Sequence, residues 1–285
     1  MKAFFLALAL AASLAQAAEM PLDKALRERK QGRFEDSILT LQGLLKAEPK
    51  NVWAWYELGL SYATDSQYAK AIDAYRLALS YGFQDGQCRC ALALALRETR
   101  KPEAALAEAQ RCLAMLPGYA GAWNLVGNAE IDLGHYDKAL EAYQKAVALS
   151  PAYANAHFNL GLVFGALHRE ADAEAAFKQA LRLQPSMTEG WDAQGECQLR
   201  RKHFRDAKKS FQQALRISPA DAAAEWGLSR AFRALGDKAS AAKHAKANKR
   251  LMREADKREA SQTAQTRRPA GVAVEAWDRD ARAGR

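Results

Sequence analysis

The sequence is poor in proline and has no hydrophobic segment long enough to cross a membrane. Only 8 of its 285 residues are proline, whereas alanine is abundant. Because proline breaks helices and alanine favours them, this composition predicts helices and argues against a β-sandwich or a β-barrel. The apolar stretch 3–14 is shorter than the about 20 residues that a membrane-spanning helix needs. The chain is nevertheless 49% hydrophobic, which is enough for a sizeable core.

The sequence also lacks the common catalytic and nucleotide-binding motifs. It contains no G-x-x-x-x-G-K-S/T, no G-x-S-x-G, no H-E-x-x-H and no G-x-G-x-x-G. No two of its 5 histidines stand four residues apart, the spacing that puts two metal ligands on one helix face. We therefore expect a protein that is not an enzyme and that needs no cofactor and no metal.

The first residues have the anatomy of a secretory signal peptide. One cation, Lys2, precedes the apolar stretch 3–14, and Ala15-Gln16-Ala17 follows it. A charged start, a short apolar centre and small residues before the cleavage point are typical of such signals, so we expect cleavage after Ala17. The sequence contains no Asn-x-Ser/Thr glycosylation acceptor, which argues against a eukaryotic secreted protein. A bacterial periplasm is the expected location.

Several kinds of residue recur every 34 positions along the chain. The alanine series is Ala71, Ala105, Ala139, Ala173, Ala207 and Ala241. The other series are the aromatic residues Tyr75, Tyr143, Phe177 and Phe211, the prolines Pro117, Pro151, Pro185 and Pro219, the glycines Gly59, Gly127, Gly161 and Gly195, and, in alternate periods, Trp55, Trp123 and Trp191. A fixed period of this length indicates a repeat architecture.

Each period contains two helical patterns. In residues 120–151 they cover about 121–133 and 137–149, and Gly134-His135-Tyr136 joins them. We expect the small residues Gly127 and Ala139 to face each other, so that the two antiparallel helices approach closely. Pro151 ends the second helix. Since a single hairpin cannot bury both of its faces, the hairpins must stack.

This pattern resembles the tetratricopeptide repeat. The residues that carry the resemblance are Trp123, Val126, Gly127, Gly134, Tyr136, Ala139, Tyr143, Ala146 and Pro151. The resemblance implies an all-α, right-handed superhelical solenoid of about seven helix-turn-helix repeats, beginning near residues 18, 52, 86, 120, 154, 188 and 222. We therefore divide the chain into a signal peptide (1–17), a solenoid (18–257) whose last helix is an extended polar cap, and a disordered basic tail (258–285).

The resemblance also implies that the first helix of each repeat lines a concave groove that binds peptides. Carried over to this sequence, the groove positions are Trp53, Tyr56, Arg97, Asn124, Asn128, Asn155, Phe158, Asn159, Asp192, Glu196, Trp226 and Arg230. Asparagine both donates and accepts hydrogen bonds, so the asparagine cluster suits a peptide backbone. Asn124, Asp192 and Glu196 stand where some family members have cations, which favours a neutral or basic segment. The alternative is that these are merely solvated helix residues.

The net charge of +9 is concentrated towards the C-terminus. Residues 1–196 carry slightly more acidic than basic side chains, whereas KHAKANKRLMREADKR (243–258) is a strongly basic helix. This helix is either a solvated cap or a surface that binds an anionic envelope polymer or lipid head groups. Nucleic acid is not expected, because export argues against it and no aromatic residue in 233–276 is available to stack on bases.

Three of the 4 cysteines lie in the third repeat. Cys88 and Cys90 start one helix, and Cys112 ends its antiparallel partner. In an oxidising compartment we expect a disulfide between Cys112 and either Cys88 or Cys90; the alternative is that all four cysteines are buried thiols. Together these patterns predict an exported, non-catalytic scaffold or adaptor in a bacterial envelope or secretion assembly, which binds peptide segments of other proteins.

Overall fold

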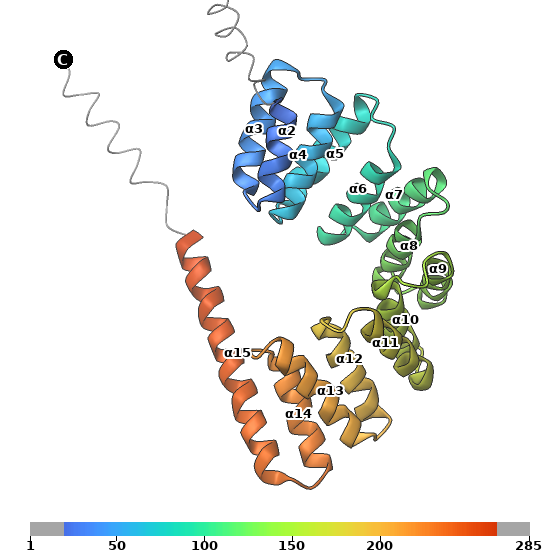
Figure 1. Cartoon of the computed structure of the whole chain (residues 1–285), viewed down its shortest axis with the longest axis vertical. Coiled ribbons are helices and arrows are strands. Elements are labelled where there is room, and N and C mark those ends of the chain that lie inside the picture. The colour runs from blue at the N-terminus through green and yellow to red at the C-terminus, as the bar shows by residue number, and fades with distance from the viewer. Residues whose placement is uncertain (1–19, 267–285) are drawn as a thin grey trace, which may run out of the picture. The chain divides into compact units, whose positions relative to one another are not determined.

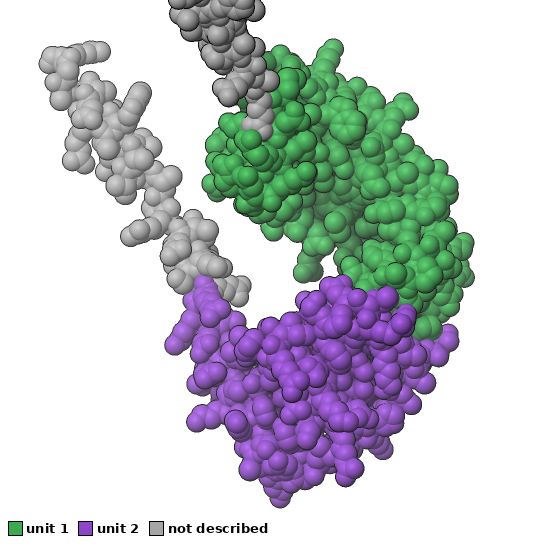
Figure 2. Space-filling view, in the orientation of Figure 1, with its two compact units in different colours: residues 1–167 green, residues 168–285 purple. Residues whose placement is uncertain are grey.

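The computed structural model describes residues 20–266, which divide into two compact units (Figure 2). The N-terminal unit ends at Leu167 and the C-terminal unit begins at His168. The described residues form 14 helices and no strand, so the predicted all-α class is confirmed. None of these helices has both the length and the apolar content that a bilayer span requires. The predicted signal peptide lies outside the described residues.

The N-terminal unit is built from nine helices (Figure 1). They are α2 (Pro21–Lys30), α3 (Phe34–Ala47), α4 (Val52–Thr64), α5 (Tyr68–Ser80), α6 (Gly86–Glu98), α7 (Pro102–Met115), α8 (Ala120–Asp132), α9 (Tyr136–Leu149) and α10 (Ala154–Ala166). Each packs against the helices that precede and follow it in the unit. Consecutive helices therefore form hairpins, and the hairpins stack, as the repeat period requires.

The C-terminal unit contains five helices with the same pattern of neighbours. They are α11 (Glu170–Leu183), α12 (Thr188–Arg200), α13 (Phe204–Ile217), α14 (Ala222–Ala234) and α15 (Lys238–Thr266). The last helix extends past residue 257, where we predicted the tail to begin. Residues 258–266 contain neither proline nor glycine, so nothing in them stops the helix.

Within each unit, the first helices of successive hairpins also contact one another. In the N-terminal unit α4 contacts α2 and α6, and α8 contacts α6 and α10; in the C-terminal unit α12 contacts α14. Second helices such as α3 and α5 make no such contact among the described residues. Because the first helices are closer together, they form the inner side of each stack, and we call their exposed side the groove face.

The repeated residues form the core of both units. The whole alanine series is buried, with at most 4% of any member exposed, and Tyr75, Tyr143, Phe177 and Phe211 are at most 2% exposed. The glycine series makes room for these rings: a Cβ atom on Gly195 would lie 2.7 Å from Phe211. The three atoms nearest to a Cβ on Gly127 all belong to Tyr143, so this ring fills the space at Gly127 as Tyr75 does at Gly59.

The hairpin turns share one backbone feature that follows the same period. Each contains one residue with positive φ, and these residues are Gly32, Ser66, Arg100, Gly134, His168, Lys202 and Gly236. Glycine adopts this left-handed conformation without strain, whereas other residues pay for the close approach of Cβ to the backbone. The positive φ at this turn position therefore recurs in every repeat, whether or not the residue is glycine.

The three tryptophans of the series are half-buried, and two of them join their helix to the loop before it. The indole nitrogen of Trp55 donates to the Pro49 carbonyl at 2.8 Å, and that of Trp191 donates to the Pro185 carbonyl at 2.9 Å. His157 stands at the tryptophan position of its repeat, and its Nε2 lies 3.0 Å from the Pro151 carbonyl. The histidine thus replaces tryptophan as a tie between helix and loop.

Candidate functional site

The groove face of the N-terminal unit begins with an aromatic cluster. Trp53, on α4, is 52% exposed and packs edge-on against Phe83, with ring centroids 4.7 Å apart. Tyr56 lies 5.1 Å from the same Phe83 ring, and burial raises the pKa of its hydroxyl to about 12. Phe83 was not among the predicted groove residues, although it stands where five other repeats of the chain have proline, namely Pro49, Pro117, Pro151, Pro185 and Pro219. That departure was the available signal.

Three predicted asparagines meet between α8 and α10. The Asn159 amide donates to Asn124 Oδ1 at 2.9 Å and to Asn128 Oδ1 at 3.1 Å. Asn128 Oδ1 also accepts a hydrogen bond from the Tyr143 hydroxyl at 2.7 Å. Burial raises the pKa of Tyr143, so this hydroxyl stays protonated and keeps donating. The cluster is thus held in one geometry by its own bonds.

These bonds decide what the asparagine cluster offers to another molecule. Asn159 uses both amide hydrogens on its neighbours, while the carbonyl oxygens of Asn124 and Asn128 accept them. Across the described part of the chain, no other residue bonds the amide groups of Asn124 and Asn128. The cluster therefore presents two amide donors, although Asn124 is only 6% exposed.

Two predicted groove cations are already paired with acids of a neighbouring first helix. Arg97 Nε lies 2.6 Å from Asp132 Oδ2, and Arg230 Nη1 lies 2.7 Å from both carboxylate oxygens of Glu196. Each pair joins successive first helices within one unit. These side chains lock neighbouring repeats together, so they are less available to a partner than the sequence suggested.

The predicted acidic patch lies on the groove face of the C-terminal unit. Asp192 is half-buried, and its Oδ1 is shielded from solvent without a hydrogen-bond partner in the described structure. Burial, together with the carboxylate of Asp221, raises the pKa of Asp192 to about 7. Asp221 is held in place because it caps α14, accepting from the amides of Ala223 and Ala224. A cation that reached Asp192 would relieve this repulsion.

The remaining predicted groove residues are placed on first helices but outside these clusters. Asn155 is exposed on α10, Phe158 is half-buried on the same helix, and Trp226 of α14 is 44% exposed. The predicted groove residues therefore lie on the two groove faces, but they form several separate clusters. The structure does not collect all the predicted residues into one site.

The cysteines form one disulfide. Cys90 is joined to Cys112, with Cα atoms 5.3 Å apart, which is one of the two pairings that the sequence left open. Cys88 and Cys197 are buried free thiols, and burial raises their pKa values to about 12 and about 11. Such thiols are protonated at neutral pH and react poorly. Residues 20–266 contain no group of three or more metal-ligating side chains placed to hold an ion.

Family models match most of the repeat region. A model described as tetratricopeptide repeat matches residues 22–86 and 193–250, and a second model with this description matches residues 154–187. A third, described as TPR repeat, matches residues 127–167. Together these matches cover more than half of the chain. No curated protein sequence matches it.

Solved structures of similar fold come from several proteins. The crystal structure of MamA is 27% identical, with a TM-score of 0.52 over 57% of this chain and 94% of MamA. PilF of Pseudomonas aeruginosa is 22% identical, with a TM-score of 0.62 over 70% of this chain and 90% of PilF. YrrB, described as a TPR protein with an unusual peptide-binding site, is 21% identical, with a TM-score of 0.51 over 60% of this chain and 88% of YrrB.

Proposed function

This chain belongs to the tetratricopeptide repeat family, whose members are protein–protein interaction scaffolds, and we propose that it too binds a partner protein. We propose that the bound part of the partner is a neutral or basic peptide segment, which lies on the groove faces. The observation that carries the proposal is the asparagine cluster. Its bonds leave the amide donors of Asn124 and Asn128 for backbone carbonyls of an incoming segment. Backbone recognition of this kind is independent of the partner's side chains.

The acidic patch of the C-terminal unit supports the preference for a basic segment. Arg230 neutralises Glu196, but no basic side chain among residues 20–266 pairs with Asp192 or Glu189. A lysine or arginine of the partner would favour the ionised form of Asp192 and lower its raised pKa. An acidic segment would add to the repulsion there and is disfavoured.

The experiment is a binding screen on peptides that share one backbone length and differ in charge. The wild-type chain should retain neutral and basic peptides and release acidic ones. The double variant Asn128→Ala/Asn159→Ala should lose most of the binding, because it removes an amide donor and the residue that orients the cluster. Gln144→Ala, at an exposed position of the second helix α9, is the matched control and should bind like the wild type. Equal binding by the wild type and the double variant would reject the proposal.

We further propose that the protein acts in the bacterial periplasm, as a non-catalytic adaptor in an envelope or secretion assembly. The support is the sequence of residues 1–17, with its single cation, apolar centre and Ala-Gln-Ala end. A fusion to a reporter enzyme that is active only in the periplasm tests this. The fusion should be active with residues 1–17 and inactive without them; activity in both forms would contradict an export role for this segment.

A second candidate function rests on the cationic array of α15. Lys243, Lys246, Arg250, Arg253 and Lys257 follow one another at three- and four-residue steps, which places them within about 80° of arc on the helix. All five are exposed. The opposite face of α15 packs on α14 through Ala241 and Asn248, so the array points to solvent. This geometry suits an anionic envelope polymer or lipid head groups.

Binding to heparin and to phosphatidylglycerol vesicles at several salt concentrations tests the second function. Arg250→Gln/Arg253→Gln/Lys257→Gln should weaken both and flatten the salt dependence, without changing peptide binding. The matched control is Lys208→Gln/Lys209→Gln on α13. Polyanion binding that survives the triple variant would exclude the array as its cause.

A further inference from the structure

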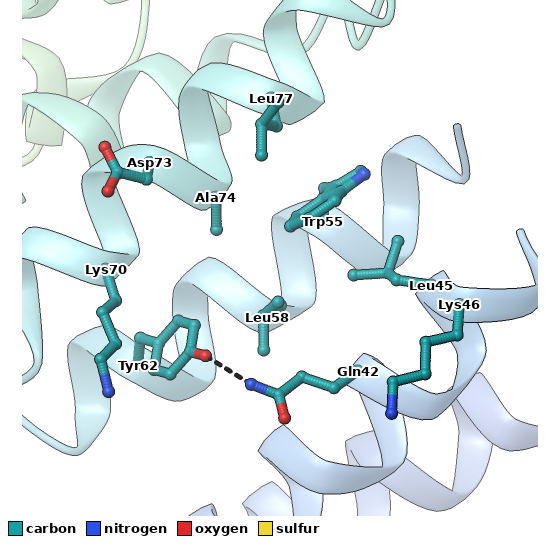
Figure 3. A pocket seen from close by; sticks show the side chains of 10 residues that line it. All are labelled: Gln42, Leu45, Lys46, Trp55, Leu58, Tyr62, Lys70, Asp73, Ala74 and Leu77. Carbon is teal, nitrogen blue, oxygen red and sulfur yellow. Dashed lines mark hydrogen bonds between the residues drawn. The ribbon is translucent and has the colours of Figure 1, made fainter. Parts of the chain in front are cut away.

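A hollow lies in the N-terminal unit, away from the groove face, between the second helices α3 and α5. Its volume is about 460 Å³, and α4 forms its floor (Figure 3). The hollow exists because α3 and α5 do not contact each other, so the side chains of α4 are open to solvent between them. Leu58 is buried at the floor, and Trp55 and Leu77 form the wall that Figure 3 shows above it.

The same place in another repeat of the chain is closed by a lysine. Lys145 and Trp123 stand 68 residues, two repeat periods, after Leu77 and Trp55. There the Lys145 ammonium covers the Trp123 ring at 4.4 Å from its centroid. In the hollow, the shorter, uncharged Leu77 leaves the Trp55 ring uncovered. The apolar surface that is open in this repeat is therefore covered in the fourth repeat.

The rim of the hollow is more basic than acidic. Lys46 of α3 and Lys70 of α5 stand on its two sides, and between them the Gln42 amide donates to the Tyr62 hydroxyl at 2.8 Å (Figure 3). Asp73 is the one acidic side chain of the lining. An apolar floor between two ammonium groups suits a large apolar side chain that has carboxylates beside it.

The chain itself contains such a segment beyond the described residues. Although the tail as a whole is basic and Arg279 follows directly, the segment VAVEAWD (272–278) contains no basic residue. It places Glu275 and Asp278 on either side of Trp277, the largest apolar side chain available. We propose that residues 272–278 dock in the hollow, with the Trp277 ring on the surface formed by Trp55 and Leu77 and with the carboxylates next to the lysines. The hollow has room for a few side chains but not for a folded domain, in keeping with a short segment.

The test measures this contact with the segment supplied as a separate peptide. A fluorescently labelled peptide of residues 270–278, which contains no basic residue, is titrated into the full chain carrying Trp277→Ala, so that the chain's own segment does not compete. We expect saturable binding that shifts the indole NMR signal of Trp55 and leaves that of Trp53, on the groove face, unchanged. The same peptide with Trp277→Ala should bind at least about tenfold more weakly.

Filling the hollow should abolish the contact without unfolding the protein. Leu77→Lys, made in the Trp277→Ala chain, copies the arrangement that the chain already uses at Lys145, and it should weaken peptide binding by at least about tenfold. The matched control is Gln213→Lys, which puts the same charge at the equivalent position of the sixth repeat and should bind the peptide as before. Lys46→Gln/Lys70→Gln should weaken binding and reduce its salt dependence.

Three results would overturn the proposal. The first is no saturable binding of the peptide, and the second is unchanged affinity in Leu77→Lys. The third is a shift of the Trp53 signal instead of the Trp55 signal, which would show that the segment binds on the groove face. Folding of each variant is checked by circular dichroism and thermal unfolding, so that lost affinity is not mistaken for lost structure.

Discussion

Tyr143 fills the space that Gly127 leaves open: a Cβ atom on Gly127 would stand 2.5 Å from Tyr143 Cε1. That separation is far inside van der Waals contact, and Tyr143 is itself 2% exposed and cannot move outward freely. The same ring carries the hydroxyl that bonds Asn128 on the groove face. One glycine–tyrosine contact therefore couples the packing of the α8–α9 hairpin to the geometry of the asparagine cluster.

The first prediction follows from this contact. Gly127→Ala should lower the free energy of unfolding by about 1–3 kcal/mol, because the added methyl group overpacks a filled core. Gly43→Ala is the control, since a Cβ there meets nothing within 4 Å, and it should be stabilising by about 0.5–1 kcal/mol. Urea unfolding of both variants measures the difference. Equal stability of the two variants would show that the Tyr143 side chain can shift at little cost to accommodate the added methyl group.

The second prediction concerns the hairpin turns. Lys202 has a φ of 61°, at the position where Gly134 has 80°. Lys202→Gly should raise the free energy of unfolding by about 0.5–1 kcal/mol, since relief of the left-handed strain exceeds the entropy cost of glycine. Gly134→Ala should change it in the opposite direction. Thermal unfolding checks both, and a loss of stability in Lys202→Gly would contradict the strain argument.

The third prediction concerns the disulfide. Cys90 and Cys112 are 22 residues apart, so opening their bond should cost about 3 kcal/mol by the chain-entropy model. Reduction with dithiothreitol should therefore lower the midpoint of urea unfolding of the wild-type chain. The variant Cys90→Ala/Cys112→Ala should show no further response to the reductant, and Cys197→Ala should respond like the wild type. A midpoint that does not depend on reductant would mean that the bond adds no stability.

The fourth prediction is a pH dependence of stability caused by Asp192. Its carboxyl has a pKa of about 7 in the folded chain, against an ordinary value of 3.8. Between these pH values the folded chain binds more protons than the unfolded chain, so the contribution of Asp192 to the free energy of unfolding falls as pH rises. Asp192→Asn should remove this fall and be more stable than the wild type above pH 7.

Denaturation of the wild type and Asp192→Asn at a series of pH values gives this contribution as a difference. Asp206→Asn, an exposed carboxyl of the same unit, serves as the control and should follow the wild type. A difference between wild type and Asp192→Asn that is constant from pH 4 to pH 8 would contradict the raised pKa.

The sequence predicted the repeats because their period reflects burial directly. The alanine and aromatic series recur at positions that the structure buries almost completely, so the pattern alone located the hairpins. Side-chain partners across helices were harder to predict. Nothing local in the sequence indicates how closely the Tyr143 ring approaches Gly127, since that depends on how far the ring reaches between two helices.

The groove side chains show the same limit. Arg97 and Arg230 stand at groove positions, but their salt bridges to Asp132 and Glu196 arise only when successive first helices are stacked. Likewise, Phe83 joins Trp53 because the loop after α5 returns to α4. Glu196 and Arg230 are one period apart, and Arg97 and Asp132 are 35 residues apart, so the period places each pair on successive first helices. Which side chains then pair depends on how those helices stack.

The most direct test of the central claim is photo-crosslinking in living cells. A photoreactive amino acid at Asn155, exposed on α10 beside the asparagine cluster, is compared with one at Gln144, exposed on the second helix α9. If the groove face of the N-terminal unit binds a partner protein, Asn155 should give one discrete adduct that disappears with Asn128→Ala/Asn159→Ala, and Gln144 should give none. Adducts of equal yield at both positions, or at Gln144 alone, would contradict the account.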